Sequence, residues 1–217
     1  MFMRSFIQAN GVDLDAFNDL PPRSAVLDIC PSAHDRSVVL FLGRIDPKKG
    51  VDQLILGFDK ARQELPELFL VIAGPGSGAY VQKLRDLASS TSSADSIQFV
   101  GPVYGESKMR VLGGADVFAL TSHEEGDSVA VKEALAAGLP VLVTPGCKID
   151  YIHDPTVGVT VEATPSEIAG GILRLAETSI GRPEPRARAK ALARGFDSRV
   201  VAERMILEYQ RMVDSEQ

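Results

Sequence analysis

The stretch Val38-Val-Leu-Phe-Leu-Gly-Arg-Ile-Asp-Pro-Lys-Lys-Gly-Val-Asp-Gln-Leu-Ile-Leu-Gly-Phe-Asp-Lys-Ala61 decides the fold. It opens with Val38–Leu42, an apolar run that is too short for a helix and rich in β-branched residues, which predicts a buried strand. After a charged loop, apolar residues recur three or four positions apart, which predicts an amphipathic helix over 52–64. The members of this stripe are Leu54, Ile55, Phe58 and Ala61. A buried strand followed by such a helix is the repeating unit of a parallel α/β sheet.

The same unit recurs along the chain. The other predicted strands are Leu68–Ala73, Ile97–Val100, Val117–Leu120, Pro140–Val143 and Gly158–Val161. The other predicted helices of this region are Ala79–Ser89, Glu106–Gly113, Val129–Ala137 and Ser166–Thr178. We therefore expect a doubly wound, Rossmann-like α/β domain over residues 37–178, preceded by a linker and lead-in segment over residues 1–36.

Residues 179–217 are expected to form a helical tail. Pro183 and Pro185 are expected to break the chain, and Gly195-Phe-Asp197 is interpreted as a stop followed by an N-cap. Ser198–Val213 then predicts a last helix with a broad apolar face that includes Val201, Met205 and Tyr209.

The composition excludes several classes of protein. The chain has 217 residues, 45% of them hydrophobic and 24% charged, which is typical of a globular domain. A net charge of −6 argues against general nucleic-acid binding, although a phosphate ligand needs only a few local cations. Two cysteines, Cys30 and Cys147, and three histidines lack metal-ligand spacing, so we expect reduced thiols and no metal site. The start of the chain lacks the apolar core of a signal peptide, and no run approaches roughly 18 apolar residues, which predicts a cytoplasmic protein without a transmembrane segment.

In a doubly wound sheet, ligands bind beyond the carboxyl ends of the strands, so the loops that follow the strands are the candidates for chemistry. The first is Gly43-Arg-Ile-Asp-Pro-Lys-Lys-Gly50, which combines cations, a rigid turn and the start of a helix. These are the features that bind a diphosphate. The alternative is a solvated basic loop.

The second loop, Gly74-Pro-Gly-Ser-Gly-Ala79, matches the dinucleotide fingerprint G-x-G-x-x-A. A nicotinamide site also needs an acidic residue about 20 positions further on, at the end of the next strand. That strand ends in Val100-Gly-Pro102, and the fingerprint normally follows the first strand of a domain. We interpret this loop as a turn that brings the backbone close to a ligand or a neighbouring helix, with an NAD-dependent dehydrogenase domain as the alternative.

The third loop begins at Ser122 and opens the helix predicted from Val129. Glu125 and Glu133 lie eight residues apart, and the backbone N–H groups between them suit a phosphate at a helix N-terminus, while carboxylates suit sugar hydroxyls. The alternative is an acidic capping segment with a solvent-facing Glu133. Another acidic pair, Asp13-Leu-Asp15, is interpreted as a turn or helix cap rather than a metal site.

Taken in order, these motifs resemble the retaining, GT-B-fold glycosyltransferases of the group 1 family, which includes sucrose synthase and bacterial mannosyltransferases. Asn10-Gly-Val-Asp13 resembles the family's linker, and the Gly43–Gly50 loop matches its G-R-x-x-P-x-K-G pattern. Glu125-x7-Glu133, followed by Ala134-Leu-Ala-Ala-Gly-Leu-Pro-Val141, matches its E-x7-E helix and the A-x-G-x-P-V that follows it. Several ordered motifs at the family's spacing are far more specific than any one of them.

The resemblance implies a donor site for a nucleoside diphosphate sugar, with no obligatory metal. It implies that Arg44 and Lys49 bind the diphosphate and stabilise the leaving nucleotide, and that Glu125 contacts the transferred sugar. It further implies phosphate binding by the backbone at Gly126–Val129, a ribose contact from Glu133, and a base near Val103 and Lys108. The full implied donor-binding set is Gly43, Gly74, Val103, Lys108, Gly126, Asp127, Ser128, Val129 and Glu133.

Two departures accompany the resemblance. Asp127 stands where the family usually has an aromatic or small residue, so we expect it either to repel a phosphate or to contact a sugar hydroxyl. The chain also resembles only the C-terminal, donor-binding lobe of a two-lobe enzyme. We therefore expect an acceptor-binding N-terminal lobe as a partner, an isolated lobe with little activity, and partial exposure of the Val201, Met205 and Tyr209 face. A sugar-nucleotide epimerase of the same architecture is the remaining alternative.

Overall fold

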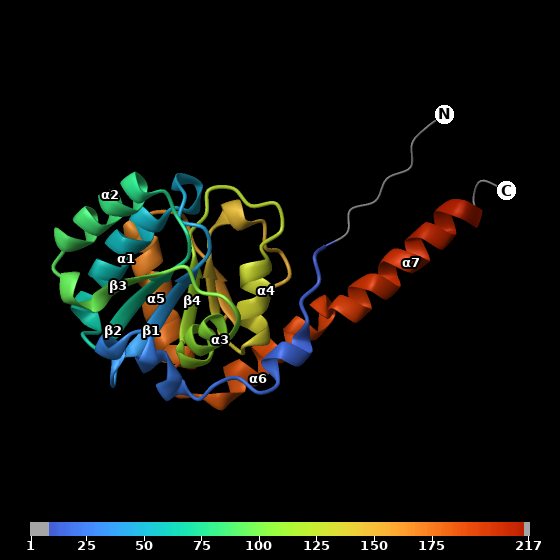
Figure 1. Cartoon of the computed structure of the whole chain (residues 1–217), viewed down its shortest axis with the longest axis horizontal. Helices are drawn as coiled ribbons and strands as arrows, with labels where there is room; N and C mark the ends of the chain where they lie inside the picture. The colour runs from blue at the N-terminus through green and yellow to red at the C-terminus, as the bar shows by residue number, and fades with distance from the viewer. Residues whose placement is uncertain (1–8, 215–217) are drawn as a thin grey trace.

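The computed structural model describes residues 9–214 and shows one sheet covered by helices (Figure 1). All six strands of the sheet are parallel, in the order β3-β2-β1-β4-β5-β6. The strands are β1 Ser37–Leu42, β2 Leu68–Ala73, β3 Ile97–Gly101, β4 Val117–Leu120, β5 Val141–Val143 and β6 Gly158–Thr160. The fold is therefore the doubly wound, Rossmann-like α/β sheet that the apolar runs predicted, and the strand order reverses at β1 and β4.

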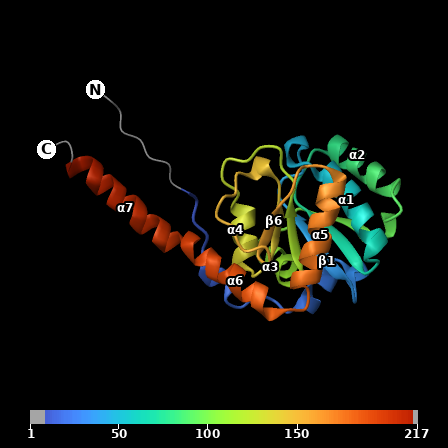
Figure 2. The ribbon, with the colours of Figure 1, turned by 180° about the vertical axis from the view of Figure 1, so that it is seen from behind.

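The helices cover both faces of this sheet (Figures 1 and 2). They are α1 Val51–Glu64, α2 Gly78–Ser89, α3 Gly105–Gly114, α4 Val129–Ala136, α5 Pro165–Ser179, α6 Pro183–Ala193 and α7 Ser198–Asp214. Helix α1 packs against α2 and α5 on one face, and α4 packs against α6 on the other. Before β1, the described lead-in residues form three short 3₁₀ turns, at Leu14–Phe17, Arg23–Asp28 and Pro31–Ala33.

Two glycines allow α5 to approach α1 and β5 closely. A Cβ on Gly57 of α1 would stand 2.6 Å from Cγ2 of Ile168 on α5. A Cβ on Gly171 of α5 would stand 2.6 Å from Cδ1 of Leu142 on β5. Small residues at both contacts let α5 lie directly on the sheet and on α1, which closes the core on that face.

The prolines of the tail begin a helix instead of breaking the chain, so that expectation is wrong. Helix α6 starts at Pro183, and Pro185 follows two residues later. Both lie in the first turn, where a backbone N–H has no intrahelical acceptor and its absence costs nothing. The helix buries Ala189 and Ala193 and packs on α4. The expected cap is confirmed, since Asp197 Oδ1 accepts a 2.8 Å hydrogen bond from the backbone N–H of Arg199.

Helix α7 extends away from the sheet and its helices (Figure 1). Met205 is 36% exposed and Tyr209 is 56% exposed, as the sequence predicted, whereas Val201 is buried. Within residues 9–214, no helix is long and apolar enough to cross a membrane. The expectation about a signal peptide concerns residues 1–8, which lie outside the described part of the chain.

The glycine-rich loop after β2 packs against the loop after β1. Gly74 has a φ of +145°, and a Cβ there would stand 1.8 Å from the carbonyl oxygen of Gly43. Gly76 pairs with Ile45 in an isolated parallel bridge. At the third fingerprint position, Ala79 is exposed, so it does not provide the close contact between helix and strand that a dinucleotide fingerprint requires. These glycines join two loops of the protein to each other.

This contact predicts unequal effects of two alanine substitutions. Gly74→Ala should destabilise the protein by about 2–4 kcal/mol, because its Cβ meets a backbone carbonyl and its φ disfavours L-residues. Gly78→Ala is the matched control, since nothing lies within 4 Å of a Cβ there. Urea denaturation measures both free energies of unfolding, and equal stability of the two variants would contradict the assigned role of Gly74.

Candidate functional site

The loops that follow β1 and β4 are joined by hydrogen bonds at the point where the strand order reverses. Thr121 Oγ1 donates a 2.8 Å hydrogen bond to the carbonyl oxygen of Gly50, and the backbone N–H of His123 donates one of 2.8 Å to the carbonyl oxygen of Lys48. Gly50 has a φ of +61°, and a Cβ there would stand 2.2 Å from the carbonyl oxygen of Thr121. Glycine is required because the two backbones are in contact.

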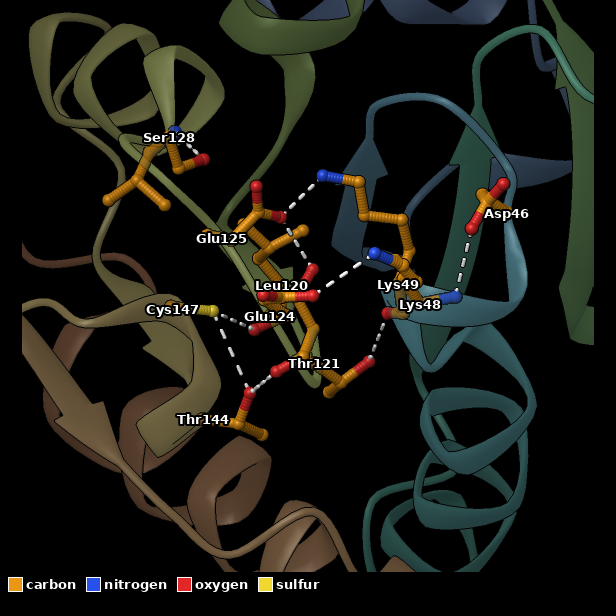
Figure 3. Close-up of polar contacts among 12 residues, drawn as sticks. Asp46, Lys48, Lys49, Leu120, Thr121, Glu124, Glu125, Ser128, Thr144 and Cys147 are labelled. Carbon is orange, nitrogen blue, oxygen red and sulfur yellow. Dashed lines mark hydrogen bonds and ion pairs between the residues drawn. The ribbon is translucent and has the colours of Figure 1, made fainter.

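The loop after β5 joins the same group (Figure 3). Thr144 Oγ1 donates a 2.6 Å hydrogen bond to the carbonyl oxygen of Ser122, and the backbone N–H of Glu125 donates one of 2.9 Å to the carbonyl oxygen of Gly146. Three loops from adjacent strands β1, β4 and β5 thus form one rigid support at the carboxyl edge of the sheet.

The cysteines have a structural place. Cys147 packs beneath the third loop, with Sγ 3.3 Å from the carbonyl oxygen of Leu120, and Cys30 is buried elsewhere. Both are free thiols. Burial raises the pKa of Cys30 to about 11 and raises the pKa of Cys147 as well, so both thiols stay protonated and poorly nucleophilic near neutral pH.

The joined loops enclose a polar cleft of about 510 Å³. Its lining residues are Arg44, Asp46, Lys48, Lys49, Glu124, Glu125, Gly126 and Lys148. Four cations thus face three carboxylates, so the cleft is net positive in a chain whose net charge is −6. This distribution favours an anionic ligand with a local, not a global, positive field.

The cations of the cleft differ in their partners. Lys48 Nζ lies 3.0 Å from Glu124 Oε2, and Lys49 is paired with Glu125 (Figure 3). The hydrogen bond from Lys48, together with nearby positive charge, lowers the pKa of Glu124. Among the described residues, no carboxylate forms an ion pair with Arg44, which is exposed. Arg44 is therefore available to an anion.

Lys148 lines the cleft, although no motif of the sequence includes it. It follows the short 3₁₀ turn Pro145–Cys147 in the loop after β5 and has a left-handed backbone, with a φ of +53°. The sequence indicates a role for Lys148 only through its position, in the loop that follows the predicted strand Pro140–Val143. The adjacent strand β5 brings that loop beside the loop after β4.

Glu125 is the most firmly held carboxylate of the cleft. Ser122 Oγ donates a 2.6 Å hydrogen bond to Glu125 Oε1, and the Lys49 ammonium group pairs with the same oxygen. Both members of this ion pair are largely buried, so charge-assisted hydrogen bonds hold the carboxylate in one orientation. A carboxylate oriented in this way can accept hydrogen bonds from ligand hydroxyls.

Helix α4 begins beside Glu125 with an open backbone. Ser128 caps the helix, since its Oγ lies 3.4 Å from the backbone N–H of Val131. Gly126 makes no hydrogen bond with any described residue, and no atom lies within 4 Å of where its Cβ would be. Val129, the first helical residue, is exposed. The start of α4 can therefore be approached by an anion.

Other residues of the implied donor set do not line this cleft. Lys108 on α3 and Glu133 on α4 form an ion pair of 2.6 Å, while Val103 is buried. Gly43 and Gly74 lie against each other at the ends of β1 and β2. The structure thus brings Arg44, Lys49, Glu125 and Gly126 into one cleft and separates a second group around Glu133.

Asp127 does not line the cleft. Its Oδ1 lies 2.5 Å from Nζ of Lys132, and its Oδ2 accepts a 2.6 Å hydrogen bond from the backbone N–H of Asn10. Partial burial alone would raise the pKa of the Asp127 carboxyl, but the hydrogen bonds from Lys132 and Asn10 outweigh burial and lower it. The negative charge of Asp127 is balanced by the positive charge of Lys132, which weakens the repulsion of a phosphate that the sequence suggested.

The remaining candidate ligands do not converge. In the described residues, no group of three or more His, Cys, Asp and Glu side chains could hold a metal ion. Asp13 Oδ1 accepts a 3.1 Å hydrogen bond from the backbone N–H of Asp15, which confirms the predicted cap. His123 is exposed and lies outside the lining of the cleft.

Comparison with known proteins assigns the fold and the family. Residues 28–195 match the model of the family "Glycosyl transferases group 1". The chain belongs to that family. It is 33% identical over 178 residues to a D-inositol 3-phosphate glycosyltransferase of Geodermatophilus obscurus, covering 78% of the chain and 39% of the relative. It is 30% identical over 217 residues to a phosphatidyl-myo-inositol mannosyltransferase of Mycobacterium tuberculosis, covering 95% of the chain and 54% of the relative.

Solved structures show the same fold at lower identity. Anabaena Alr3699/HepE, solved in complex with UDP, superposes with a TM-score of 0.80 at 19% identity, over 94% of this chain and 57% of that one. The C-terminal domain of a glycosyl transferase group 1 protein, LpcC of Francisella tularensis, superposes with a TM-score of 0.68 at 20% identity, over 89% of this chain and 97% of that one. The group 1 chain thus has the Rossmann-like lobe of a GT-B fold, and it spans about half the length, or less, of the relatives named above.

In this group 1 chain, the hydrogen bond between Thr121 and Gly50 can be tested by a substitution that removes the hydroxyl and changes the side chain's shape little. Thr121→Val should destabilise the protein by about 1–2 kcal/mol, because it removes the hydroxyl that donates to Gly50 and leaves the packing intact. Hydrogen exchange at the His123 amide should accelerate as the two loops separate more often. Thr160→Val, at the exposed end of the edge strand β6, is the control, and an equal loss in both variants would contradict the joining role.

The lowered pKa of Asp127 predicts a pH dependence of folding. Its stabilising contribution should be fully present above the pKa of the unfolded carboxyl, near 4 in peptides, and should be lost as the pH falls through the lower folded pKa. The difference in free energy of unfolding between the wild type and Asp127→Asn should therefore be large at neutral pH and shrink in acid. Urea denaturation at a series of pH values measures it, and a difference that does not change with pH would exclude the assigned ion pair.

Proposed function

We propose that this chain is the donor-binding lobe of a retaining glycosyltransferase, which transfers a hexose from a nucleoside diphosphate sugar. The observation that supports this best is the cleft itself. An arginine that pairs with no described carboxylate, a firmly held carboxylate and the open start of α4 lie together there. Each of these groups suits one part of such a donor. A solvated basic loop would not require the precise joining of three loops beneath it.

The diphosphate is proposed to bind between Arg44 and the start of α4. Arginine forms charge-assisted hydrogen bonds to phosphate oxygens, and the helix N-terminus adds backbone donors and a partial positive charge. Lys49 shares its ammonium group between Glu125 and the ligand, and Lys148, which forms no ion pair with a described residue, adds a further cation at the rim. When the bond between the sugar and the phosphate breaks, its electron pair goes to the diphosphate, and these cations stabilise that charge.

The sugar and the nucleoside are proposed to occupy the two sides of this diphosphate. Glu125, oriented by Ser122, would accept hydrogen bonds from hydroxyls of the transferred hexose. One carboxylate oxygen of Glu133 would accept hydrogen bonds from ribose hydroxyls, while the other stays paired with Lys108. Buried Val103 would offer an apolar contact near the base.

The remaining parts of the proposal rest on relatives. Proteins named as mannosyltransferases support a hexose donor, and Alr3699/HepE has been solved with UDP-glucose. Retention at the anomeric carbon rests on the family resemblance. The proposed enzyme needs no obligatory metal, because the cleft supplies its own cations for the leaving group. An acceptor-binding lobe in the rest of the protein and a cytoplasmic location complete the proposal.

The other candidate functions have less support. A dehydrogenase would use the glycine-rich loop for its dinucleotide, but Gly74 is engaged with Gly43 and Ala79 is exposed. Nothing in the cleft favours a sugar-nucleotide epimerase.

Calorimetric titration with GDP-mannose, UDP-glucose and ADP-glucose tests this proposal. We expect one of the three to bind, weakly for a lobe alone, and Arg44→Ala to weaken that binding by about 10- to 100-fold, because it removes a charged hydrogen-bond donor. Gly126→Ala should also weaken binding without loss of stability. The Cβ of the new alanine contacts no protein atom within 4 Å and would occupy space proposed for the ligand.

Arg174→Ala provides the control, because Arg174 is an exposed arginine on α5 outside the cleft. Absence of binding by all three nucleotide sugars, or equal binding by the wild type and Arg44→Ala, would exclude the assigned donor site. Stabilisation by NAD alone would instead favour the dehydrogenase.

A further inference from the structure

Lys132 is a charged side chain in the interior of the protein. It lies in the middle of α4, the helix that opens at the proposed donor site, and its side chain is only 1% exposed. A lysine in such a place has lost the hydration of its ammonium group, which costs far more than one ordinary hydrogen bond returns. Its neighbours must therefore replace water around the charge.

Those neighbours come from three separate parts of the chain. The ammonium Nζ lies 2.5 Å from Oδ1 of Asp127, donates a 2.9 Å hydrogen bond to the carbonyl oxygen of Asn10, and lies 5.1 Å from the ring centroid of Phe196. The backbone N–H of Asn10 donates to the other oxygen of Asp127, at 2.6 Å. We call Asn10, Asp127, Lys132 and Phe196 the lysine cluster. Its hydrogen bonds form a closed ring through Asp127, Lys132 and Asn10.

One side of the lysine cluster contacts residues 125–129, here called the donor loop, through Asp127. Asp127 stands between Gly126, which lines the cleft, and Ser128, which caps α4. Its carboxylate is turned toward Lys132 and does not line the cleft. Holding that side chain fixes the direction of the adjacent peptide groups, and these are the groups proposed to meet the phosphate.

The other side of the cluster lies where segment 10–12 meets the start of α7. Val12 pairs with the residues that precede α7, since its N–H donates a 2.8 Å hydrogen bond to the carbonyl oxygen of Phe196, and its own carbonyl oxygen accepts one of 2.9 Å from Ser198. A Cβ on Gly11 would stand 2.7 Å from Cα of Ser198, so the two segments are in direct contact. Figure 1 shows both segments leaving the domain together beside α4.

We propose that Lys132 is a positioning residue that couples the docking of segments 10–12 and 196–198 to the conformation of the donor loop. If segment 10–12 moves away, Lys132 loses an acceptor and Asp127 loses a donor at the same time. The buried ion pair is then incompletely satisfied, and Asp127 must reorient toward water, which changes the loop that carries Gly126. Conversely, a ligand that requires the present loop conformation favours the docked segments by the same free energy.

Hydrogen exchange in the absence of any nucleotide tests this coupling. Lys132→Met removes the charge at similar length, and we expect exchange in both segments 9–13 and 125–131 to accelerate by about tenfold or more, as expected for a broken buried pair. Lys60→Met, at an exposed position on α1, is the matched control and should leave both segments unchanged. Wild-type exchange in either segment of Lys132→Met would overturn the proposal.

A second perturbation acts from the opposite side, in case Lys132→Met fails to fold. Asn10→Pro removes one backbone N–H at an exposed residue, 117 positions from Asp127 in the sequence. We expect faster exchange over 125–131, whereas Asn10→Ala keeps the backbone donor and should have the smaller effect. An effect of Asn10→Pro that is confined to its own segment would overturn the coupling.

A double substitution separates positioning from stability alone. Asp127→Leu with Lys132→Met replaces the ion pair by apolar groups and should recover the melting temperature lost in Lys132→Met. It should not recover the slow exchange of segment 9–13, because Asn10 still lacks both partners. Full recovery of both would show that Lys132 only stabilises the fold.

The consequence for ligand binding rests on the proposed function and has its own measurement. If the wild type binds a nucleotide sugar, Lys132→Met should weaken that binding by about tenfold, and Lys60→Met should not change it. Because the exchange experiments contain no nucleotide, a protein that binds no donor but shows the coupling would disprove the proposed function and leave the positioning role of Lys132 intact.

Discussion

The contact between Gly50 and Thr121 determines the geometry of the whole cleft. Strands β1 and β4 are neighbours at the reversal of the strand order, so the chain leaves them toward opposite faces of the sheet and a crevice opens between the two loops. The hydroxyl of Thr121 and the carbonyl of Gly50 close the floor of that crevice. Lys49 and Ser122 are the next residues on either side, so this contact also sets the positions from which both reach Glu125.

Charge is arranged around this floor so that the carboxylates do not oppose an anion. Glu124 and Glu125 each have a lysine partner, and no described carboxylate forms an ion pair with Arg44 or Lys148 at the rim. The third carboxylate of the cleft, Asp46, accepts a 3.0 Å hydrogen bond from the backbone N–H of Lys48. A chain with net charge −6 can therefore still present a local positive field to a phosphate. The same pairing orients Glu125, so one set of contacts serves both attraction and orientation.

The sequence allows the sheet to be predicted because its central strands are nearly continuous apolar runs, and β2 and β4 begin and end at the expected residues. The tail was harder, since Pro183 and Pro185 break a helix in its interior but begin one in its first turn. The loops of the site could be predicted from their position after strands. The contacts between these loops could not be predicted, because Lys49 and Glu125 lie 76 residues apart and meet only through the strand order.

Asp127 shows why a single residue in a binding loop cannot be interpreted alone. Beside a phosphate its charge suggests repulsion, yet Lys132 neutralises it from within α4. The two lie five positions apart, which is outside the three- and four-residue spacings that predict ion pairs within a helix. They can still pair because Asp127 lies before the start of α4 and does not follow helical spacing. Both also hydrogen-bond Asn10, which only the folded chain brings there. A buried lysine in α4 and an acidic residue in the loop are therefore one feature, and a change at either position alters the other's environment before it alters a ligand's.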